Sequence, residues 1–98
     1  MTYYLYMLEC SNNSFYIGYT TDIKRRYQEH CEGSAKCKYT RSFPPQKLAA
    51  CWAFDIDLGE ILSLEKRLKQ LTRVEKESLV EQPNSLKALT DQEFKLFI

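Results

Sequence analysis

Glu65 is the acidic side chain whose position in the sequence points most directly to chemistry. The apolar spacing between residues 58 and 71 predicts a helix, on which an arc of about 120° holds four apolar side chains, Leu58, Ile61, Leu62 and Leu68. Glu65 falls inside this arc. A carboxylate among apolar side chains is costly unless it is paired, hydrogen-bonded or bound to a metal. The sequence leaves open a divalent cation, an ion pair, or an apolar face that opens to solvent at Glu65.

Arg26 and His30 form a second polar pair beside an apolar stripe. In a helix that begins after Asp22, Ile23 and Tyr27 define the buried side, and Arg26 and His30 are four residues apart along its flank. A cation and the one histidine of the chain are therefore expected to lie together at the edge of the core. The structural alternatives are a partly buried histidine with one hydrogen bond and an arginine whose stem packs on the core.

Tyr6 and Tyr16 lie on two short runs, residues 3–10 and 15–20, that are rich in aromatic and apolar side chains. A Ser/Asn turn separates the runs, which predicts a β-hairpin. Because side chains alternate along a strand, the two tyrosines share a face only if the turn has an odd number of residues. A three-residue turn at 11–13 brings them together, whereas a two-residue turn separates them. The sequence allows both, and tyrosines that only pack would look the same.

The remaining elements predict an α+β fold with a small three-stranded antiparallel sheet flanked by helices. Gly33 is expected to end the helix that begins after Asp22. Capping-box spacings precede three further helices. The predicted elements are a basic loop at 32–47, a third strand at 47–54, and helices at 58–71, 73–81 and 91–97. We expect residues 1–82 to form the main domain and residues 83–98 to form a helical tail packed on it.

The charge of the chain is unevenly distributed along its 98 residues. The net charge is only +1, but residues 24–47 carry seven basic and two acidic side chains. Such a segment can follow a phosphate backbone, although a solvated surface with scattered lysines is the alternative. The residues that we expect to contact nucleic acid are Lys36, Lys38, Tyr39, Thr40 and Arg41.

Several classes of protein are excluded by composition. Apolar residues make up 44% and charged residues 28%, which is typical of a globular domain. The sequence shows no signal peptide and no apolar run long enough for a membrane span, so we expect a cytoplasmic protein that does not bind membranes. The four cysteines form no CxxC pair and fit no zinc-ligand pattern, so packed thiols are expected.

These elements in this order resemble the GIY-YIG nuclease family, in its small stand-alone, single-domain branch. Tyr-Leu-Tyr at 4–6 stands where the family has Gly-Ile-Tyr, and Tyr-Ile-Gly at 16–18 matches directly. Arg26 and His30 match the Arg and His of the following helix, and Glu65 matches the glutamate that binds metal. The resemblance covers residues 2–81. Two departures are Tyr4 in place of the first glycine and the lack of a sure counterpart for a late asparagine, for which Asn84 is a weak candidate.

The resemblance implies hydrolysis of DNA phosphodiester bonds with one divalent ion, Mg²⁺ or Mn²⁺. It implies that Glu65 holds the metal, that Arg26 neutralises the phosphate, and that Tyr6 is the general base. Tyr16 is expected to position the attacking water or a phosphate oxygen, and His30 to assist Tyr6 or hold a phosphate. The division of roles among Tyr6, Tyr16 and His30 stays open.

The expected substrate is a DNA structure rather than one tight sequence, because the chain shows no added recognition module and phosphate contacts carry no sequence information. Roles in DNA repair or in mobile elements fit such a nuclease. The alternatives are a nucleic-acid-binding module with little intrinsic cleavage, a partner-dependent nuclease subunit, and a nuclease directed at RNA. A targeting protein or a homodimer, formed through the apolar residues of 82–98, is also left open.

Overall fold

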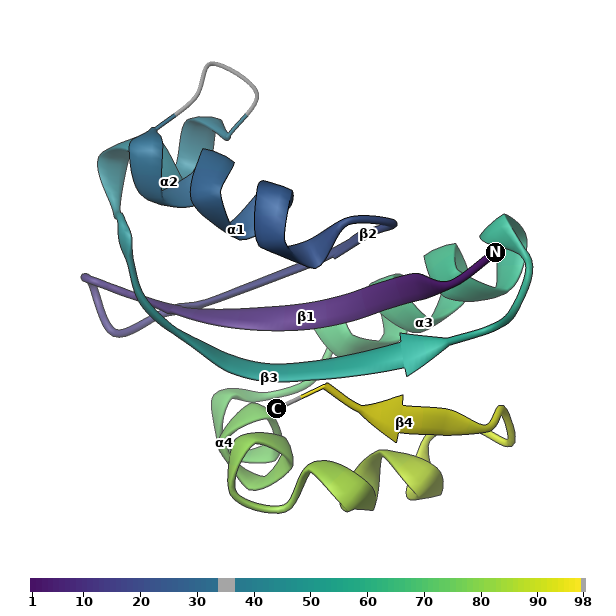
Figure 1. Ribbon diagram of the computed structural model, residues 1–98. Coiled ribbons are helices and arrows are strands. Elements are labelled where there is room, and N and C mark those ends of the chain that lie inside the picture. The colour runs from purple at the N-terminus through teal and green to yellow at the C-terminus, as the bar shows by residue number, and fades with distance from the viewer. Residues whose placement is uncertain (34–36, 98) are drawn as a thin grey trace.

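A four-stranded antiparallel sheet in the order β2-β1-β3-β4 organises the computed structural model, which describes residues 1–33 and 37–97 (Figure 1). The elements are β1 Tyr3–Cys10, β2 Phe15–Thr20, α1 Ile23–Glu32, α2 Lys38–Ser42, β3 Pro45–Phe54, α3 Leu58–Lys69, α4 Arg73–Glu81, the 3₁₀ helix η1 Pro83–Ala88 and β4 Phe94–Leu96. The α+β class is confirmed. Within the described part of the chain, no helix is long and apolar enough to cross a membrane.

The hairpin of β1 and β2 has the three-residue turn that brings the two tyrosines to one face. Tyr6 lies opposite Gly18 and Leu8 lies opposite Tyr16. The turn is closed by a hydrogen bond from the Cys10 amide to the Ser14 carbonyl (2.9 Å), and Asn13 adopts a left-handed conformation with φ 63°. Asparagine tolerates this conformation, and a residue in this region is common in three-residue hairpin turns.

The two faces of the sheet carry different layers of helix, as Figure 1 shows. The larger core lies between one face and the elements α3, α4 and η1, with Leu5, Met7 and Trp52 of the sheet at its centre. The opposite face carries α1 and packs a smaller cluster around Tyr6 and Ile23. Alternation along β1 therefore sends Tyr3, Leu5 and Met7 toward the main core and Tyr6 toward α1.

Helix α1 begins and ends at the predicted residues. The Asp22 carboxylate accepts a hydrogen bond from the Arg25 amide (3.2 Å), and Gly33 ends the helix with φ 70°. The left-handed conformation costs glycine least, because glycine has no Cβ, and glycine is the usual residue at this position of a helix end. These caps fix the rotation of α1, so that Ile23 and His30 are buried against the sheet.

The C-terminal tail differs from the prediction, which had three strands and a helix at 91–97. The sheet has a fourth strand, β4, whose Leu96 pairs with Trp52. The Phe-Lys-Leu sequence of β4 alternates with the period of a strand, and this pattern prevails over the capping-box spacing at Thr90. Thr90 instead accepts a hydrogen bond from the Gln92 amide (3.1 Å) within a turn.

The predicted basic loop at 32–47 contains two regular segments. Helix α2 occupies residues 38–42, and β3 begins at Pro45, two residues earlier than expected. Proline is tolerated at the first residue of a strand because an amide hydrogen bond to the neighbouring strand is not needed there. Of the three predicted capping boxes, the one formed by Thr72 and Glu75 at α4 is present, whereas the Asp57 side chain makes no capping hydrogen bond.

The prediction of packed thiols holds for three of the four cysteines. Cys10, Cys37 and Cys51 are buried and Cys31 is exposed. Burial raises the pKa of Cys51 to about 12 and also raises the pKa of Cys10. Because the thiolate is the form that reacts and binds metals, these two thiols act as packing groups.

Candidate active site

Three side chains form a buried hydrogen-bonded chain on the α1 face of the sheet. The Tyr6 hydroxyl of β1 lies 2.8 Å from Nε2 of His30 on α1. Nδ1 of the same ring lies 2.7 Å from the Thr40 hydroxyl of α2. All three side chains are nearly inaccessible, with exposed fractions of 1%, 0% and 1% in that order. One strand and two helices therefore meet at His30.

The hydrogen bonds define the tautomer of His30. The Thr40 hydroxyl donates its one hydrogen to the carbonyl oxygen of Cys37 (3.2 Å), so its oxygen accepts from Nδ1 of His30. Nε2 of the neutral ring then carries a lone pair and accepts the hydrogen of the Tyr6 hydroxyl. The chain is directional, and a proton released by Tyr6 has an acceptor already in place.

Gly18 is required by the close approach of Tyr6 to β2. A Cβ at position 18 would lie 2.6 Å from the Tyr6 hydroxyl oxygen and 2.8 Å from the ring carbon that carries it. The Tyr6 hydroxyl is buried and bonded to His30, so it cannot yield without losing that bond. Glycine at 18 is therefore part of the site, and a larger residue would displace the tyrosine.

Burial and charge shift the acidities of the cluster. Burial raises the pKa of Tyr6 well above its ordinary value, and the guanidinium of Arg26 partly opposes this rise. Burial and, to a smaller extent, the positive charge of Arg26 together lower the pKa of His30 to about 4, and Glu29 partly opposes this change. His30 is therefore neutral near pH 7, as the tautomer requires.

Arg26 and Tyr16 are the more accessible members of the same cluster. The Arg26 guanidinium is 3.2 Å from the Glu29 carboxylate, and their side chains are 22% and 25% exposed. Burial acts against the charged form of Arg26, but the Tyr6 and Glu29 oxygens outweigh it and raise its pKa. The half-buried Tyr16 ring packs edge-on to His30, with centroids 4.9 Å apart. The structure thus brings together Tyr6, Tyr16, Arg26 and His30, four of the five residues to which the resemblance assigns catalytic roles.

The residues expected to contact nucleic acid separate into three groups. Lys38 and Arg41 are exposed on α2, and Tyr39 on the same helix is 39% exposed. The prediction that Thr40 contacts nucleic acid was wrong. Its side chain is buried, and its hydroxyl is hydrogen-bonded to His30 and to the Cys37 carbonyl oxygen. Lys36 lies outside the described residues.

Glu65 lies on α3, which packs against β2 on the other face of the sheet. Its side chain is 17% exposed and its carboxylate is 3.5 Å from the Lys69 ammonium. The ion pair was one of the alternatives left open by the sequence. The expectation of an apolar arc around Glu65 was wrong in part, because Leu58 and Leu62 are 47% and 41% exposed. The buried stripe consists of Ile61, Leu64 and Leu68, so Glu65 lies at its margin.

The donor set fits a weakly held hard cation better than a closed metal site. In residues 1–33 and 37–97, no cluster of three or more His, Cys, Asp or Glu side chains could hold an ion. Mg²⁺ keeps most of its waters and is commonly bound by one or two carboxylates together with substrate phosphates. Glu65, partly buried and with an exposed lysine as its partner, fits this mode.

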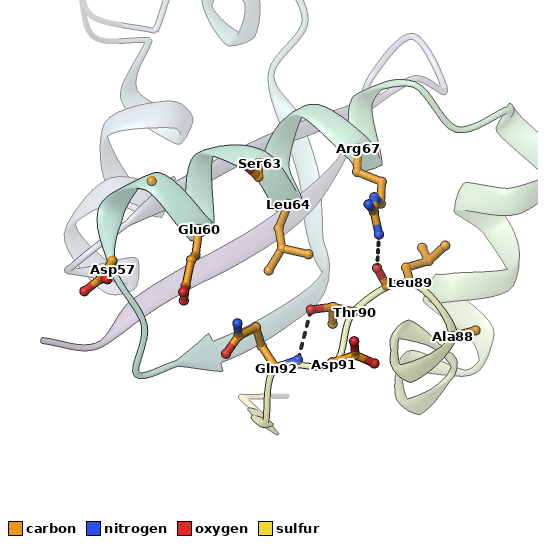
Figure 2. A pocket seen from close by; sticks show the side chains of 11 residues that line it. Asp57, Glu60, Ser63, Leu64, Arg67, Ala88, Leu89, Thr90, Asp91 and Gln92 are labelled. Atoms are coloured by element: carbon orange, nitrogen blue, oxygen red, sulfur yellow. Dashed lines mark hydrogen bonds between the residues drawn. The ribbon is translucent and has the colours of Figure 1, made fainter.

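An acidic groove of about 660 Å³ lies elsewhere, between α3 and the segment that joins η1 to β4 (Figure 2). Asp57, Glu60 and Asp91 line it, and the Arg67 guanidinium in it donates to the Leu89 carbonyl oxygen. None of the predicted catalytic residues lines this groove. Three carboxylates around one arginine would repel a phosphate backbone, so the groove is no candidate for DNA binding.

Comparison with protein families shows the family of the chain. The sequence model of the GIY-YIG catalytic domain family matches residues 2–78 of the chain. The chain belongs to the GIY-YIG family. Tyr6, Tyr16, Arg26, His30 and Glu65 all lie within the matched part of this GIY-YIG protein.

Small proteins named UPF0213 are similar to this GIY-YIG chain. UPF0213 protein BH0048 of Halalkalibacterium halodurans is 45% identical over 80 residues, which are 82% of this chain and 83% of the relative. UPF0213 protein VNG_2274C of Halobacterium salinarum is 43% identical over 79% of this chain and 97% of its own. The solution NMR structure of UPF0213 protein BH0048 from Bacillus halodurans covers 95% of this chain and 100% of its own, with 38% identity and a TM-score of 0.53. The relatives thus share the small single-domain form, and their names state no activity.

Two features of this GIY-YIG site could not be found in the sequence by spacing alone. Thr40 orients the His30 ring through a hydrogen bond. The five residues of α2 show no apolar periodicity from which the buried position could be predicted. Gly18 was recognised only as part of a tripeptide, and its contact with Tyr6 depends on the hairpin register. The odd-turn alternative for the hairpin was the one available signal.

Proposed function

We propose that this chain is a divalent-metal-dependent endonuclease that hydrolyses phosphodiester bonds of DNA. The observation that carries the proposal is the directional chain from Tyr6 through His30 to Thr40, with the Arg26 guanidinium beside it. Burying a neutral histidine and a tyrosine hydroxyl costs free energy that apolar residues in the same space would avoid. A functional role explains why the polar pair is there. The membership in a nuclease family gives this arrangement its context.

Arg26 is the proposed phosphate ligand. A guanidinium can donate two parallel hydrogen bonds to phosphate oxygens and stabilise the charge that develops during attack. Its present partner, Glu29, is a partly exposed carboxylate that a phosphate can replace. Tyr16, the more accessible of the two tyrosines, is proposed to hold the attacking water or a phosphate oxygen.

Tyr6 is the proposed general base, acting together with His30. Tyr6 takes a proton from the attacking water while its own hydroxyl proton passes to Nε2 of His30, so the raised pKa of Tyr6 need not be overcome by forming a free tyrosinate. A phosphate bound to Arg26 offsets the charge that lowers the pKa of His30 and so makes His30 a better acceptor. Because Tyr6 is only 1% exposed, this role requires Arg26 to move toward the phosphate and uncover the hydroxyl.

Glu65 is the proposed metal ligand, with Mg²⁺ or Mn²⁺ as the ion. When bound, such an ion supplies charge stabilisation for the phosphate and for the leaving oxygen. The Lys69 ammonium that now pairs with the carboxylate is 53% exposed, so it can turn into solvent without a burial cost. Lys38 and Arg41 are proposed to hold the DNA backbone near the site.

Cleavage of supercoiled plasmid and of branched and flapped duplexes tests the proposal. The wild-type chain should cut in Mg²⁺ or Mn²⁺ and not in chelator. Glu65→Ala should remove most of the activity, and Glu60→Ala, on the exposed side of the same helix, should retain it. Metal-independent cutting, or full activity of Glu65→Ala, would contradict the proposal.

The same assay distinguishes the roles of Tyr6 and Tyr16. Tyr6→Phe should lower the cleavage rate by about 10²-fold or more, the usual effect of losing a general base. Tyr16→Phe should weaken DNA binding or the rate while leaving the Tyr6–His30 pair intact. Binding of DNA without cleavage, unaltered by either change, would favour the binding module.

A further inference from the structure

A row of aromatic rings runs outward from the Tyr6 cluster. The rings of Tyr6 and Tyr16 have centroids 6.4 Å apart. The Tyr16 ring stacks on Tyr39 with centroids 5.8 Å apart and planes 28° from parallel. Phe43 follows, with its centroid 5.4 Å from that of Tyr39. The row thus connects the proposed site of hydrolysis with the surface at the end of α2.

The outer two rings, Tyr39 and Phe43, are exposed, and hydrogen bonds hold Tyr39 in place. Tyr39 and Phe43 are each 39% exposed. The Tyr39 hydroxyl is fixed by the β1–β2 turn, where it accepts from the Asn12 amide (3.2 Å) and bonds the Ser14 hydroxyl. These bonds explain why Tyr39 is anchored, but they do not explain why Phe43, which has no polar group, is left in water beside it. An exposed aromatic surface of which one ring is hydrogen-bonded in place is suited to stacking with another ring.

The charge around the rings narrows the class of ligand. Lys38 and Arg41 are exposed on the same five-residue helix as Tyr39, and no acidic residue lies between Cys37 and Phe54. Aromatic side chains interleaved with cations form the surfaces on which single-stranded nucleic acids bind, with phosphates on the cations and bases on the rings. Within a duplex, both faces of a base are already covered by its neighbours, so an unpaired base is the fitting ligand.

We propose that Tyr39 and Phe43 form a stacking site for an unpaired nucleobase beside the phosphate that is cut. The inference rests on the proposed function and adds the substrate class, namely DNA with a gap, a flap or a single-stranded segment at the cleavage position. The base stacks on the Phe43–Tyr39 surface while its own or the adjacent phosphate reaches Arg26. The nuclease then prefers DNA with an unpaired base over fully paired duplex, because only an unpaired base can stack on these two rings.

Fluorescence of 2-aminopurine tests the stacking directly, because stacking on an aromatic ring quenches it. The wild-type chain is titrated, in chelator so that no cutting occurs, onto a duplex with one unpaired 2-aminopurine in a gap and onto the same duplex fully paired. We expect quenching and tighter binding on the gapped DNA. Phe43→Leu, which keeps an apolar side chain but removes the ring, should weaken binding to the gapped DNA about fivefold or more and abolish the quenching.

Two further variants guard the result against a folding defect. Phe43→Trp restores a ring and should restore the quenching. Phe97→Leu is the matched control, because Phe97 is 41% exposed and packs against Tyr4 rather than in the row, and it should behave as wild type. Equal binding of gapped DNA by Phe43→Leu and wild type, or the absence of quenching with wild type, would overturn the stacking site.

The stacking site and the nuclease can fail separately. Quenching that depends on Phe43, together with no cleavage in Mg²⁺ or Mn²⁺, would uphold the stacking site and reject the nuclease. Metal-dependent cleavage that is equally fast on gapped and paired DNA, and unaffected by Phe43→Leu, would reject the stacking site and leave the nuclease standing.

Discussion

The one histidine of the chain carries a free-energy cost that depends on pH. His30 is completely buried and neutral, with its pKa lowered to about 4, whereas a histidine in an unfolded chain titrates near ~6.5. Between these values the unfolded chain binds the proton and the folded chain does not. The free energy of unfolding therefore falls as the pH drops through this window, and the effect levels off below about 4.

This gives a prediction at the scale of one residue. His30 should make the free energy of unfolding about 2 kcal/mol smaller at pH 5 than at pH 7. Urea unfolding at the two pH values, for wild type and for His30→Gln, isolates the effect, because the chain has no other histidine. The carboxylates that titrate at lower pH are common to both proteins. An equal change with pH in the two proteins would show that His30 is not held neutral in the folded state.

Chemistry at the residue scale was only partly predictable. The sequence placed Arg26 and His30 together because both lie on one helix, where a spacing of four residues fixes their relation. It could not choose the side of the hairpin for Tyr16, because that choice depends on a single residue in the turn. Thr40 was assigned to the surface for its basic neighbours, although its hydroxyl lies 2.7 Å from the His30 ring. Contacts between separate elements are set by packing that no local pattern contains.

At the scale of elements, the C-terminal tail that contains η1 and β4 forms part of the main core and of the sheet. Leu86 of η1 is fully buried in the main cluster, and the Pro83 carbonyl oxygen accepts from the Trp52 indole nitrogen (2.8 Å). β4 then covers the open edge of β3. An exposed edge would otherwise be available for pairing with another chain.

We therefore predict that Leu86→Ala strongly destabilises the protein. The loss should be about 2–5 kcal/mol of the free energy of unfolding, as for other leucines removed from closed cores. Trp52 is the chain's one tryptophan, so its fluorescence reports unfolding at this contact. The control is Leu62→Ala on α3, where the side chain is 41% exposed and the loss should stay below about 1 kcal/mol. Equal losses for the two variants would mean that η1 is not part of the core.

Elements with their own caps or stripes were predicted, and elements defined by their neighbours were not. α1 and α4 carry end signals that act within a few residues, namely Asp22, Gly33 and the Thr72–Glu75 box. α2 is five residues long, and β4 is three residues that form a strand through pairing with β3. Elements this short have little intrinsic stability, so their form depends on the surface that they meet.

At the scale of the molecule, two surfaces on opposite sides of the sheet differ in charge, namely α2 and the groove beside α3. The side that carries α1 and α2 presents Lys38 and Arg41 next to the Tyr6 cluster. The other side holds the acidic groove beside α3. Under the proposed function, repulsion at the groove and attraction at α2 would orient a DNA backbone before any close contact forms. The net charge of +1 hides this asymmetry.

The salt dependence of DNA binding measures this asymmetry. Each phosphate contact contributes roughly 0.9 to the slope of log affinity against log salt concentration on duplex DNA, because neutralising a phosphate releases counterions. If Lys38 and Arg41 each neutralise one phosphate, the double change Lys38→Ala and Arg41→Ala should reduce that slope by about 2. The control removes two exposed lysines near the other edge of the sheet, Lys87 and Lys95, whose surroundings include Asp91 and Glu93, and it should leave the slope unchanged. A slope reduced equally by both double variants would indicate that DNA is held by diffuse charge rather than by α2, and the Arg26 site would then need another source of orientation.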